Sequence, residues 1–321
     1  MSLEINLSAG NKNNMDENKV YDVLIVGGGP AGLNAALYSK RKGLEVGILS
    51  KDLGGQVMDT SSVENYLGFS SITGEGLMKK FIEHVNELSV PYLEYVEVKD
   101  IKDGKIKEVL LDNGSIYKGK SIIIATGSKP RKMGVPGELE YSNKGVCYCA
   151  ICDGPLFAGE EVIVAGGGNS AVEAAIDLAK IAKKVTLVHR SKFRADKILI
   201  DQLFSYDNVE VKLETQILKV VGEKFMNGIV VKDKNSNSDY NIEAAGLFVE
   251  IGYIPNSDPF KNLIALNSSG EIIVDKYGKT SIEGIFAAGD VTDTPFKQII
   301  MSAGDGAKCS LAANDYINTL K

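Results

Sequence analysis

Cys149 and Cys152, separated by two residues, are the side chains of this sequence best suited to chemistry. A dithiol at this spacing can close a disulfide within one turn, and the C-x-x-C arrangement commonly lowers one thiol pKa to about 7 or less. The resulting thiolate is a nucleophile for thiol–disulfide exchange. Asp153 follows directly and could donate a proton to a leaving thiolate if desolvation raises its pKa, although capping a helix is the alternative use of an aspartate there.

A zinc site is the competing interpretation of these cysteines. Cys147, Cys149 and Cys152 offer three sulfur ligands, but Cys309 is remote in sequence and neither of the two histidines lies nearby. Structural zinc normally takes four Cys and His ligands. The sequence therefore predicts a redox pair without a metal, with Cys147 as a bystander unless it exchanges disulfide partners with Cys149.

A glycine motif occurs twice, once before and once after the cysteine pair. Residues 27–32 read GGGPAG after the apolar run 20–26, and residues 166–171 read GGGNSA after the run 162–165. In such a motif Gly27 permits a tight turn, Gly29 lets the backbone approach a pyrophosphate, and Gly32 allows a helix to pack on a strand. The pyrophosphate rests on amides at the helix N-terminus. A strand-to-helix turn without a ligand is the alternative.

The residues that follow each motif indicate which nucleotide it would bind. After the first motif the next strand ends at residues 49–52 (LSKD), so the acidic residue expected for a ribose hydroxyl is missing and Asp52 is displaced. After the second motif come His189, Arg190 and Arg194, where an NAD-specific site would place an acid. Such cations can pair with a 2′-phosphate, which predicts NADPH. A solvated basic loop, with NADH as the nucleotide, is the alternative.

The apolar runs predict an α/β fold with two Rossmann-like nucleotide-binding domains, each with three layers (ββα). Both motifs lie within a strand, helix, strand order that is typical of parallel βαβ units. Further strands are expected at 121–125, 246–251, 271–274 and 284–288, and a helix is expected to end near residue 320. The second domain, 131–254, carries the cysteine pair and is inserted into the first, 20–130 and 255–321.

Two Gly/Pro stretches, 126–136 and 252–255, are expected to act as paired hinges between the domains. Cysteines on the inserted domain cannot meet both the first nucleotide site and a protein partner in one pose, so we expect a rotation between domains.

Residues 1–19 are Asn-rich at their start and lack the basic and apolar parts of a signal peptide. We expect them to be a disordered tail.

Composition and charge exclude several classes of protein. The 321 residues carry a net charge of −6, which argues against a nucleic-acid partner. No apolar stretch reaches the length of about 18 residues that a membrane span needs. Four cysteines, three of them clustered, do not make a secreted disulfide framework. We therefore expect a cytoplasmic protein that binds neither nucleic acid nor membranes.

Six motifs resemble the low-molecular-weight thioredoxin reductase family in order and spacing. They are residues 27–32, 54–56 (GGQ), 65–66 (NY), 125–127 (ATG), 149–154 (CAICDG), and 289–290 (GD) with 296–298 (FKQ). The resemblance implies that the first domain binds FAD and the second binds NADPH. It implies an FAD site made of Gly27, Gly29, Pro30, Ala31, Gly32, Gly55, Gln56, Asn65, Ala125, Thr126, Gly127, Gly289, Asp290 and Gln298.

For NADPH the resemblance implies a site made of Gly166, Gly168, Asn169, Ser170, His189, Arg190 and Arg194. The family pattern of His-Arg-Arg is broken at Ser191, and the basic loop is one residue short. Lys192 could supply the cation that Ser191 lacks, and NADH remains the alternative nucleotide. In the FAD site Asp290 would bind a ribityl hydroxyl, with capping of its own turn as the alternative.

The same resemblance implies that Cys152 faces the flavin and that Cys149 attacks the disulfide of a thioredoxin-like or glutaredoxin-like protein. The expected activity is thioredoxin-disulfide reductase, and a homodimer is expected from the family. Residues 153–157 (DGPLF) and 270–290 look closest to the reductase portion of the alkyl hydroperoxide reductase flavoprotein, which feeds a peroxiredoxin system. Only about 20 residues precede the first domain, so we expect electrons to leave for a separate protein. A ferredoxin-linked flavoprotein and a non-catalytic redox sensor are the remaining alternatives.

Overall fold

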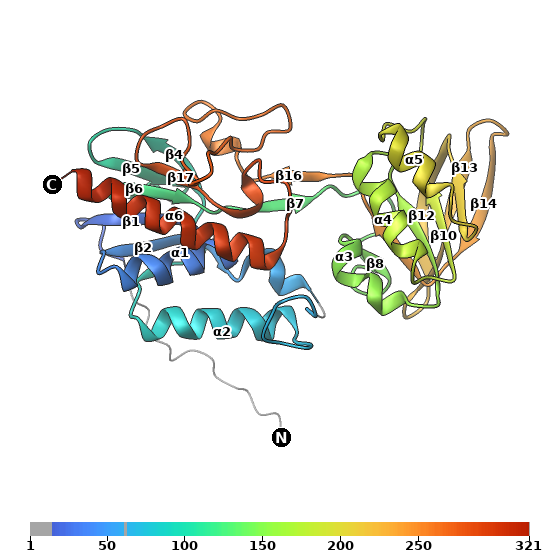
Figure 1. Ribbon diagram of the computed structural model, residues 1–321, viewed down its shortest axis with the longest axis horizontal. Coiled ribbons are helices and arrows are strands. Elements are labelled where there is room, and N and C mark those ends of the chain that lie inside the picture. The colour runs from blue at the N-terminus through green and yellow to red at the C-terminus, as the bar shows by residue number, and fades with distance from the viewer. Residues whose placement is uncertain (1–14, 61–62, 321) are drawn as a thin grey trace, which may run out of the picture. The chain divides into compact units, whose positions relative to one another are not determined.

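The structure is a computed structural model that describes residues 15–60 and 63–320. The described chain divides into two compact units, shown in Figure 1. The first comprises residues 15–60, 73–129 and 254–320, and the second comprises residues 63–72 and 130–253.

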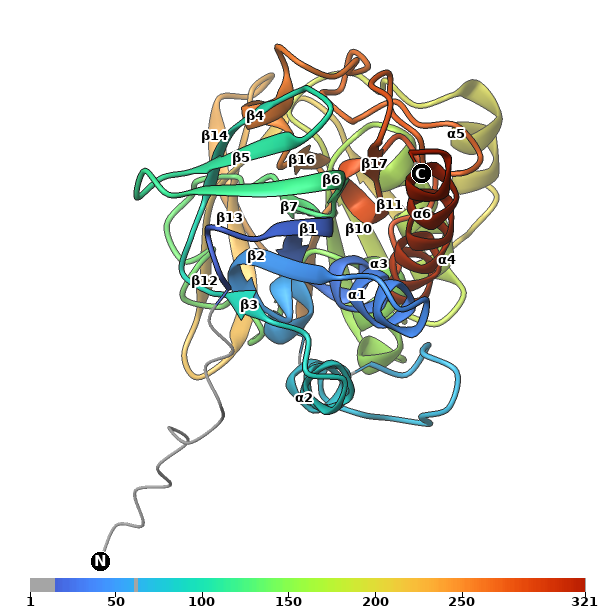
Figure 2. The same cartoon turned by 90° about the vertical axis from the view of Figure 1, so that its left-hand side faces the viewer.

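The first unit is built on a seven-stranded sheet in the order β3-β2-β1-β6-β5-β4, with β17 paired to β6. Its strands are β1 (Val20–Gly28), β2 (Val46–Leu53), β3 (Tyr92–Leu93), β4 (Val98–Lys102), β5 (Lys107–Leu111), β6 (Ile116–Ile124) and β17 (Ile285–Ala287). Strands β4, β5 and β6 are antiparallel, and the other pairs are parallel. Figure 2 shows the strands in this order, with the helices α1 (Pro30–Arg41), α2 (Gly74–Glu87) and α6 (Ile299–Thr319) beside them.

The apolar side chains of strand β1 explain why it lies at the centre of this unit's sheet. Val23 and Ile25 pack with residues of α1, α2 and α6, whereas Leu24 and Val26 pack into a second core on the opposite face. A strand that is apolar on both faces is typical of the centre of a parallel sheet covered on both sides. The carboxyl end of this central strand leads into the first glycine motif.

The second unit has a parallel sheet in the order β11-β10-β9-β15-β8. Its strands are β8 (Val146–Cys147), β9 (Glu161–Ala165), β10 (Lys184–Val188), β11 (Val209–Lys212) and β15 (Gly246–Val249). Helices α3 (Ala150–Asp153), α4 (Asn169–Ala179) and α5 (Lys197–Leu203) accompany it, with a three-stranded antiparallel sheet of β12 (Thr215–Gly222), β13 (Met226–Asp233) and β14 (Ser238–Glu243).

The side chains of strand β9 alternate between two cores, as those of β1 do. Val162 and Val164 pack with residues of α4, and Ile163 and Ala165 pack with residues of β12 and β13. Sheet, helices and antiparallel sheet therefore form three layers. The α/β class with two Rossmann-like units is confirmed.

The structure also corrects details of the sequence-based expectations. Residues 1–14 of the predicted tail lie outside the described residues, but residues 15–19 belong to the first unit. Met15 is buried against Gly47, and Lys19 pairs with Glu45 at 2.7 Å, so disorder is the wrong prediction for these five residues. Residues 271–274 form no regular strand, because only Ile272 makes isolated bridges.

The chain passes between the units on either side of residues 63–72, and again near β7 (Ser128–Pro130) and β16 (Tyr253–Pro255). These two short strands pair with each other. Both lie within the Gly/Pro stretches for which hinges are predicted. The assignment of FAD to the first unit and NADPH to the second stays a prediction.

Candidate active site at the disulfide and the glycine turns

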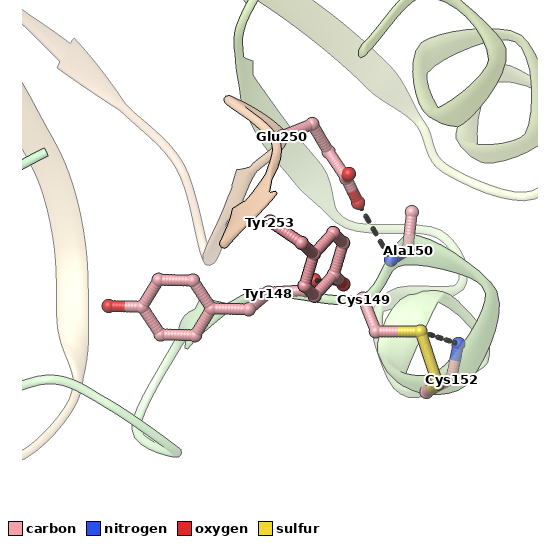
Figure 3. Close-up of a disulfide and its surroundings, with 6 residues drawn as sticks. All are labelled: Tyr148, Cys149, Ala150, Cys152, Glu250 and Tyr253. Atoms are coloured by element: carbon pink, nitrogen blue, oxygen red, sulfur yellow. Dashed lines mark hydrogen bonds between the residues drawn. A yellow bond between two sulfur atoms is a disulfide. The ribbon is translucent and has the colours of Figure 1, made fainter. Parts of the chain in front are cut away.

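Cys149 and Cys152 form a disulfide in the second unit, with their Cα atoms 5.3 Å apart. Cys149 is the N-cap of α3, and its Sγ accepts a hydrogen bond from the Cys152 amide at 3.2 Å (Figure 3). Residues three apart in a helical turn lie on the same side, which brings the two sulfur atoms together. Both residues are half-buried, whereas Cys147 and Cys309 are buried free thiols.

Tyr148 fixes the segment that leads into the disulfide. Its hydroxyl donates a hydrogen bond to Glu138 at 3.1 Å, and its carbonyl accepts one from the Tyr253 hydroxyl at 2.7 Å. Glu138 is only 1% exposed and also accepts hydrogen bonds from the amides of Met133 and Gly134. A buried carboxylate with three donors is a fixed anchor, so the backbone before Cys149 is held from two directions.

Asp153 and Cys147 form a second pair beside the disulfide. Burial raises the pKa of Asp153 to about 6, and a hydrogen bond with Cys147 opposes this increase. Burial, and then the neighbouring Asp153, raises the pKa of the Cys147 thiol far above its usual range. Asp153 is therefore able to hold a proton near neutral pH. Cys147 stays a thiol that donates to Asp153, and its role as a bystander stays a prediction.

Asp153→Asn is expected to change how stability depends on pH. A carboxyl whose pKa rises from 3.8 to about 6 on folding stabilises the folded state below pH 4, and this stabilisation is lost as the pH increases to about 6. At about 1.4 kcal/mol per pKa unit, the loss amounts to about 3 kcal/mol. The Asn variant lacks this loss. Its unfolding free energy should therefore increase relative to that of the wild type as the pH rises from 4 to about 6. Denaturant unfolding of both proteins from pH 4 to 7.5 measures the difference, and a constant difference would contradict the raised pKa.

The first glycine motif turns β1 into α1, with Gly29 as the N-cap. Gly27 has a φ of +113°, and a Cβ there would lie closer than 3.0 Å to the carbonyl oxygen of Ala125. A Cβ at Gly32 would approach the carbonyl oxygen of Gly27 equally closely. At Gly29, in contrast, a Cβ would meet no atom of this chain nearer than 4.0 Å. Two of the glycines therefore build the turn, and Gly29 faces space beside the helix N-terminus.

Other predicted FAD-site residues surround this turn in the first unit. A Cβ at Gly55 would lie 3.4 Å from the Gly29 Cα, and the Gly55 amide donates to the displaced Asp52 at 3.0 Å. A Cβ at Gly289 would lie 3.1 Å from the Cβ of Ala31, so segments far apart in the sequence meet at the motif. Pro30 and Ala31 are the first residues of α1, and Gln56 is exposed in the 3-10 helix η1 (Gly55–Asp59).

Residues 125–127 follow β6 next to Gly27. The Thr126 hydroxyl donates to the Asn256 carbonyl and the Asn256 side-chain amide donates to the Thr126 carbonyl, both at 2.9 Å. Gly127 has a φ of +65°, which favours glycine. This turn is therefore fixed by a residue 130 positions further along the chain.

Asp290 lies in the 3-10 helix η4 (Gly289–Val291), and its carboxylate accepts a hydrogen bond from the Ser302 hydroxyl of α6 at 3.0 Å. Burial raises its pKa. Its partner is therefore a neighbouring helix and not the backbone of its own turn. Gln298 is the N-cap of α6 in the same unit, but Asn65 belongs to residues 63–72 of the second unit and is not grouped with these residues.

The second glycine motif has the same geometry between β9 and α4. Gly166 has a φ of +153°, and a Cβ there would lie closer than 3.0 Å to the carbonyl oxygen of Glu250. A Cβ at Gly168 would meet nothing within 4 Å. Ala171 is fully buried at the third position, and Ser170 is exposed. The roles of the three positions are thus repeated, with alanine tolerated where the helix packs.

The basic loop after β10 is tied to the second turn. The Arg194 amide donates to the Gly167 carbonyl at 2.8 Å. The Asn169 side chain and Asp196 exchange two hydrogen bonds, each 2.9 Å long, one of them from the Asp196 amide. The loop is therefore fixed relative to the helix N-terminus, and the Asn169 side chain is part of that attachment.

The cations of this loop differ in exposure. Arg190, Lys192 and Arg194 are exposed, whereas His189 is buried and its ring nitrogen lies 3.1 Å from the Ser191 hydroxyl. Burial, and then Arg194 and Arg190, lowers the pKa of His189. The imidazole is therefore neutral near pH 7 and supports the turn, while the arginines are available to an anion.

Both turns fit the pyrophosphate of a dinucleotide. Neither α1 nor α4 has a side-chain cap, so the first amides of each helix can serve another acceptor. Gly29 and Gly168 are the positions where a side chain would project beside those amides and not into the protein. A phosphate is favoured there by the amides and by the helix dipole.

Several polar residues that hold these parts in place are missed by the sequence-based prediction. They are Glu138, Asp196, Lys234, Glu250 and Asn256. Lys234 donates to the Arg190 carbonyl at 2.6 Å from the β13–β14 hairpin. Glu250 has a signal in the sequence, because an acidic residue directly follows the buried strand β15 and precedes Gly252.

Comparisons with known proteins are consistent with this geometry. Residues 21–307 match the family described as pyridine nucleotide-disulphide oxidoreductase. The chain is 47% identical to the alkyl hydroperoxide reductase F subunit of Pseudomonas aeruginosa and 44% identical to a protein named NADH dehydrogenase of Bacillus subtilis, each over 92% of this chain and 58% of the relative. The thioredoxin reductase structure of Streptococcus pyogenes matches 94% of this chain and 99% of its own, with 39% identity and a TM-score of 0.89.

The chain thus spans less than two thirds of the length of these curated relatives, at 58%. Among the helices of residues 15–60 and 63–320, none has the length and apolarity needed to cross a membrane. Within the same described residues, no three His, Cys, Asp or Glu side chains are grouped as a metal site.

Proposed function

The chain belongs to the pyridine nucleotide-disulphide oxidoreductase family, and we propose that it is an FAD-dependent disulfide reductase that carries electrons from NADPH to a thioredoxin-like or glutaredoxin-like protein. Family membership makes it an oxidoreductase that uses a flavin and a nicotinamide, and it confirms the resemblance carried by the six motifs. The observation that supports the proposal best is the Cys149–Cys152 disulfide, which shares one unit with a glycine turn and Asp153.

The reduced cysteines would reduce the partner by two exchange steps. When bound, the flavin supplies the two-electron link between a nicotinamide and the disulfide. The Cys149 thiolate attacks one sulfur of the partner disulfide, which forms a mixed disulfide and releases one partner thiolate. Cys152 then attacks the Cys149 sulfur, which restores the disulfide and releases the second thiolate. Each released thiolate takes one proton, and Asp153, with its pKa of about 6, would supply one of them.

Arg190→Ala with Arg194→Ala is expected to lower kcat/KM for NADPH about a hundredfold or more, with little change for NADH. Both guanidinium groups are exposed on the loop that is fixed to the second turn, and each charged hydrogen bond to a phosphate contributes about 1.5–3 kcal/mol. Steady-state rates with both nucleotides measure the ratio. Lys219→Ala removes an exposed cation on β12 of the same unit and should leave that ratio unchanged. A parallel decrease for both nucleotides would contradict a 2′-phosphate contact.

An anaerobic titration tests the proposed function as a whole. The purified protein should show a flavin absorption band that NADPH bleaches, and addition of an oxidised thioredoxin-like protein should restore the band with stoichiometric thiol formation. A purified protein without a flavin absorption band would contradict the proposed FAD cofactor. A flavin that NADPH bleaches but that no thioredoxin-like or glutaredoxin-like disulfide reoxidises would refute the proposed acceptors.

An alkyl-hydroperoxide-reductase type of NAD(P)H reductase, which feeds a peroxiredoxin system, is the second candidate. It is favoured by the 47% identity to the Pseudomonas aeruginosa protein and by Ser191, which interrupts the basic loop. NADH preferred over NADPH, together with peroxide consumption when a peroxiredoxin system is added, would favour this candidate. The ferredoxin-linked alternative has no use for the disulfide.

A further inference from the structure

Glu250 lies between two parts of the proposed active site. In the sheet order β15 lies between β9, which leads to Gly166, and β8, which leads to the disulfide. Glu250 directly follows β15, and its amide donates to the Ala165 carbonyl at 2.8 Å. Its position at the carboxyl edge of the sheet is therefore fixed by the neighbouring strand.

The backbone and the side chain of Glu250 contact different parts of the site. The Glu250 carbonyl oxygen occupies the space that a Cβ on Gly166 would need. Its carboxylate oxygen Oε1 accepts a hydrogen bond from the Ala150 amide at 3.2 Å, and Ala150 lies between the two cysteines (Figure 3). One residue therefore contacts both the nucleotide turn and the turn that carries the disulfide.

The carboxyl of Glu250 is in an apolar setting. Burial raises its pKa to about 7, and the Ala150 amide opposes this increase. The titratable or charged groups on the elements around it are Cys147 on β8, Tyr148, Cys149, Cys152 and Asp153 around α3, His189 after β10, and Arg131 and Tyr253 in the connecting segments. No lysine, arginine or histidine among the described residues contributes to the pKa of Glu250, so no cation offsets its charge there.

We propose that Glu250 is a positioning residue for the Cys149–Cys152 pair and that its charge opposes ionisation of the reduced cysteines. This inference rests on the proposed function, in which the pair cycles between disulfide and dithiol. Reduction adds two electrons and two protons to give two thiols, and one thiol must then release its proton to become the nucleophile. A nearby carboxylate disfavours that second negative charge, whereas the neutral acid does not.

The Glu250→Gln substitution separates the two roles. Glutamine keeps an oxygen that can accept the Ala150 hydrogen bond but carries no charge. In the protein reduced with dithiothreitol, iodoacetamide alkylation of Cys149 and Cys152 is measured by mass spectrometry of their peptide from pH 5 to 9.5. We expect the midpoint of the rate profile to be about one pH unit lower in the variant, with the difference vanishing near pH 6, where Glu250 is protonated. The Glu243→Gln variant, with the same charge change on an exposed residue of β14, should match the wild type.

Hydrogen exchange of the Ala150 amide tests the positioning role. Protection should persist in Glu250→Gln and decrease at least tenfold in Glu250→Ala, which lacks the acceptor, while amides of β9 keep their protection in both variants. Identical alkylation midpoints in the wild type and Glu250→Gln would overturn the electrostatic role, and unchanged exchange in Glu250→Ala would overturn the positioning role. Neither measurement needs a nicotinamide or a protein acceptor, so failure of the proposed function would be seen separately in the anaerobic titration.

Discussion

Cys149→Ser should lower the rate of protein-disulfide reduction by at least about a thousandfold, because the serine hydroxyl cannot replace a thiolate in exchange. Electron transfer from NADPH to an artificial dye should stay near the wild-type rate, since the proposed nucleotide sites do not include this side chain. Cys152→Ser should be equally inactive in turnover, yet it retains Cys149 and lacks the thiol that resolves the mixed disulfide. The partner should therefore stay covalently attached to Cys149, which non-reducing electrophoresis detects.

The other two cysteines supply matched controls. Cys309 is buried, burial raises its thiol pKa to about 12, and its Sγ donates to the Ala287 carbonyl at 3.1 Å. Cys147 is buried and hydrogen-bonded to Asp153. Serine can donate the same hydrogen bond in each case, so Cys309→Ser and Cys147→Ser should both retain disulfide reduction. Inactivity of Cys147→Ser would indicate disulfide exchange with Cys149, and loss of dye reduction in Cys149→Ser would contradict the proposed separation of the two reactions.

The parts of the site that the sequence predicts are those with short-range causes. The C-x-x-C spacing places two cysteines in one turn and so predicts the disulfide that the structure shows. The glycines at positions 27 and 166 are needed because of their φ values and close carbonyl neighbours, and the apolar runs before them predict the central strands β1 and β9. The fold class follows from these repeated units.

The parts that the sequence does not predict depend on contacts between distant segments. Nothing near Gly166 in the chain indicates that the Glu250 carbonyl lies against it, and nothing near Thr126 indicates its exchange of hydrogen bonds with Asn256. His189 shows a different limit. Its type and position suggest a cation for phosphate, but burial and the adjacent arginines lower its pKa, so only the structure shows that its charge is suppressed.

Gly29→Ala and Gly27→Ala should separate binding from folding at the first turn. A methyl group at Gly29 meets no atom of the chain nearer than 4.0 Å, so the unfolding free energy of the flavin-free protein should change by less than about 1 kcal/mol. The same methyl group projects where a pyrophosphate would approach the amides of α1. Flavin affinity should therefore decrease about ten- to a hundredfold, as expected when an added methyl group must displace a tightly packed neighbour.

Gly27→Ala should act on the fold itself. Its φ of +113° disfavours a side chain, and the added Cβ would clash with the Ala125 carbonyl, which forms part of the backbone and cannot move aside alone. Strain and clash together should lower the unfolding free energy by at least about 3 kcal/mol. Denaturant unfolding and flavin content after purification measure both effects.

Gly168→Ala is the matched control for Gly29→Ala, because a Cβ at Gly168 also meets nothing of the chain within 4 Å but lies in the other unit. It should leave flavin content and stability unchanged and raise KM for the nicotinamide instead. Flavin loss in Gly168→Ala with full retention in Gly29→Ala would reverse the assignment of the two turns. Full retention of both nucleotides in both variants would mean that neither middle glycine faces a pyrophosphate, and the two turns would then serve only to join a strand to a helix.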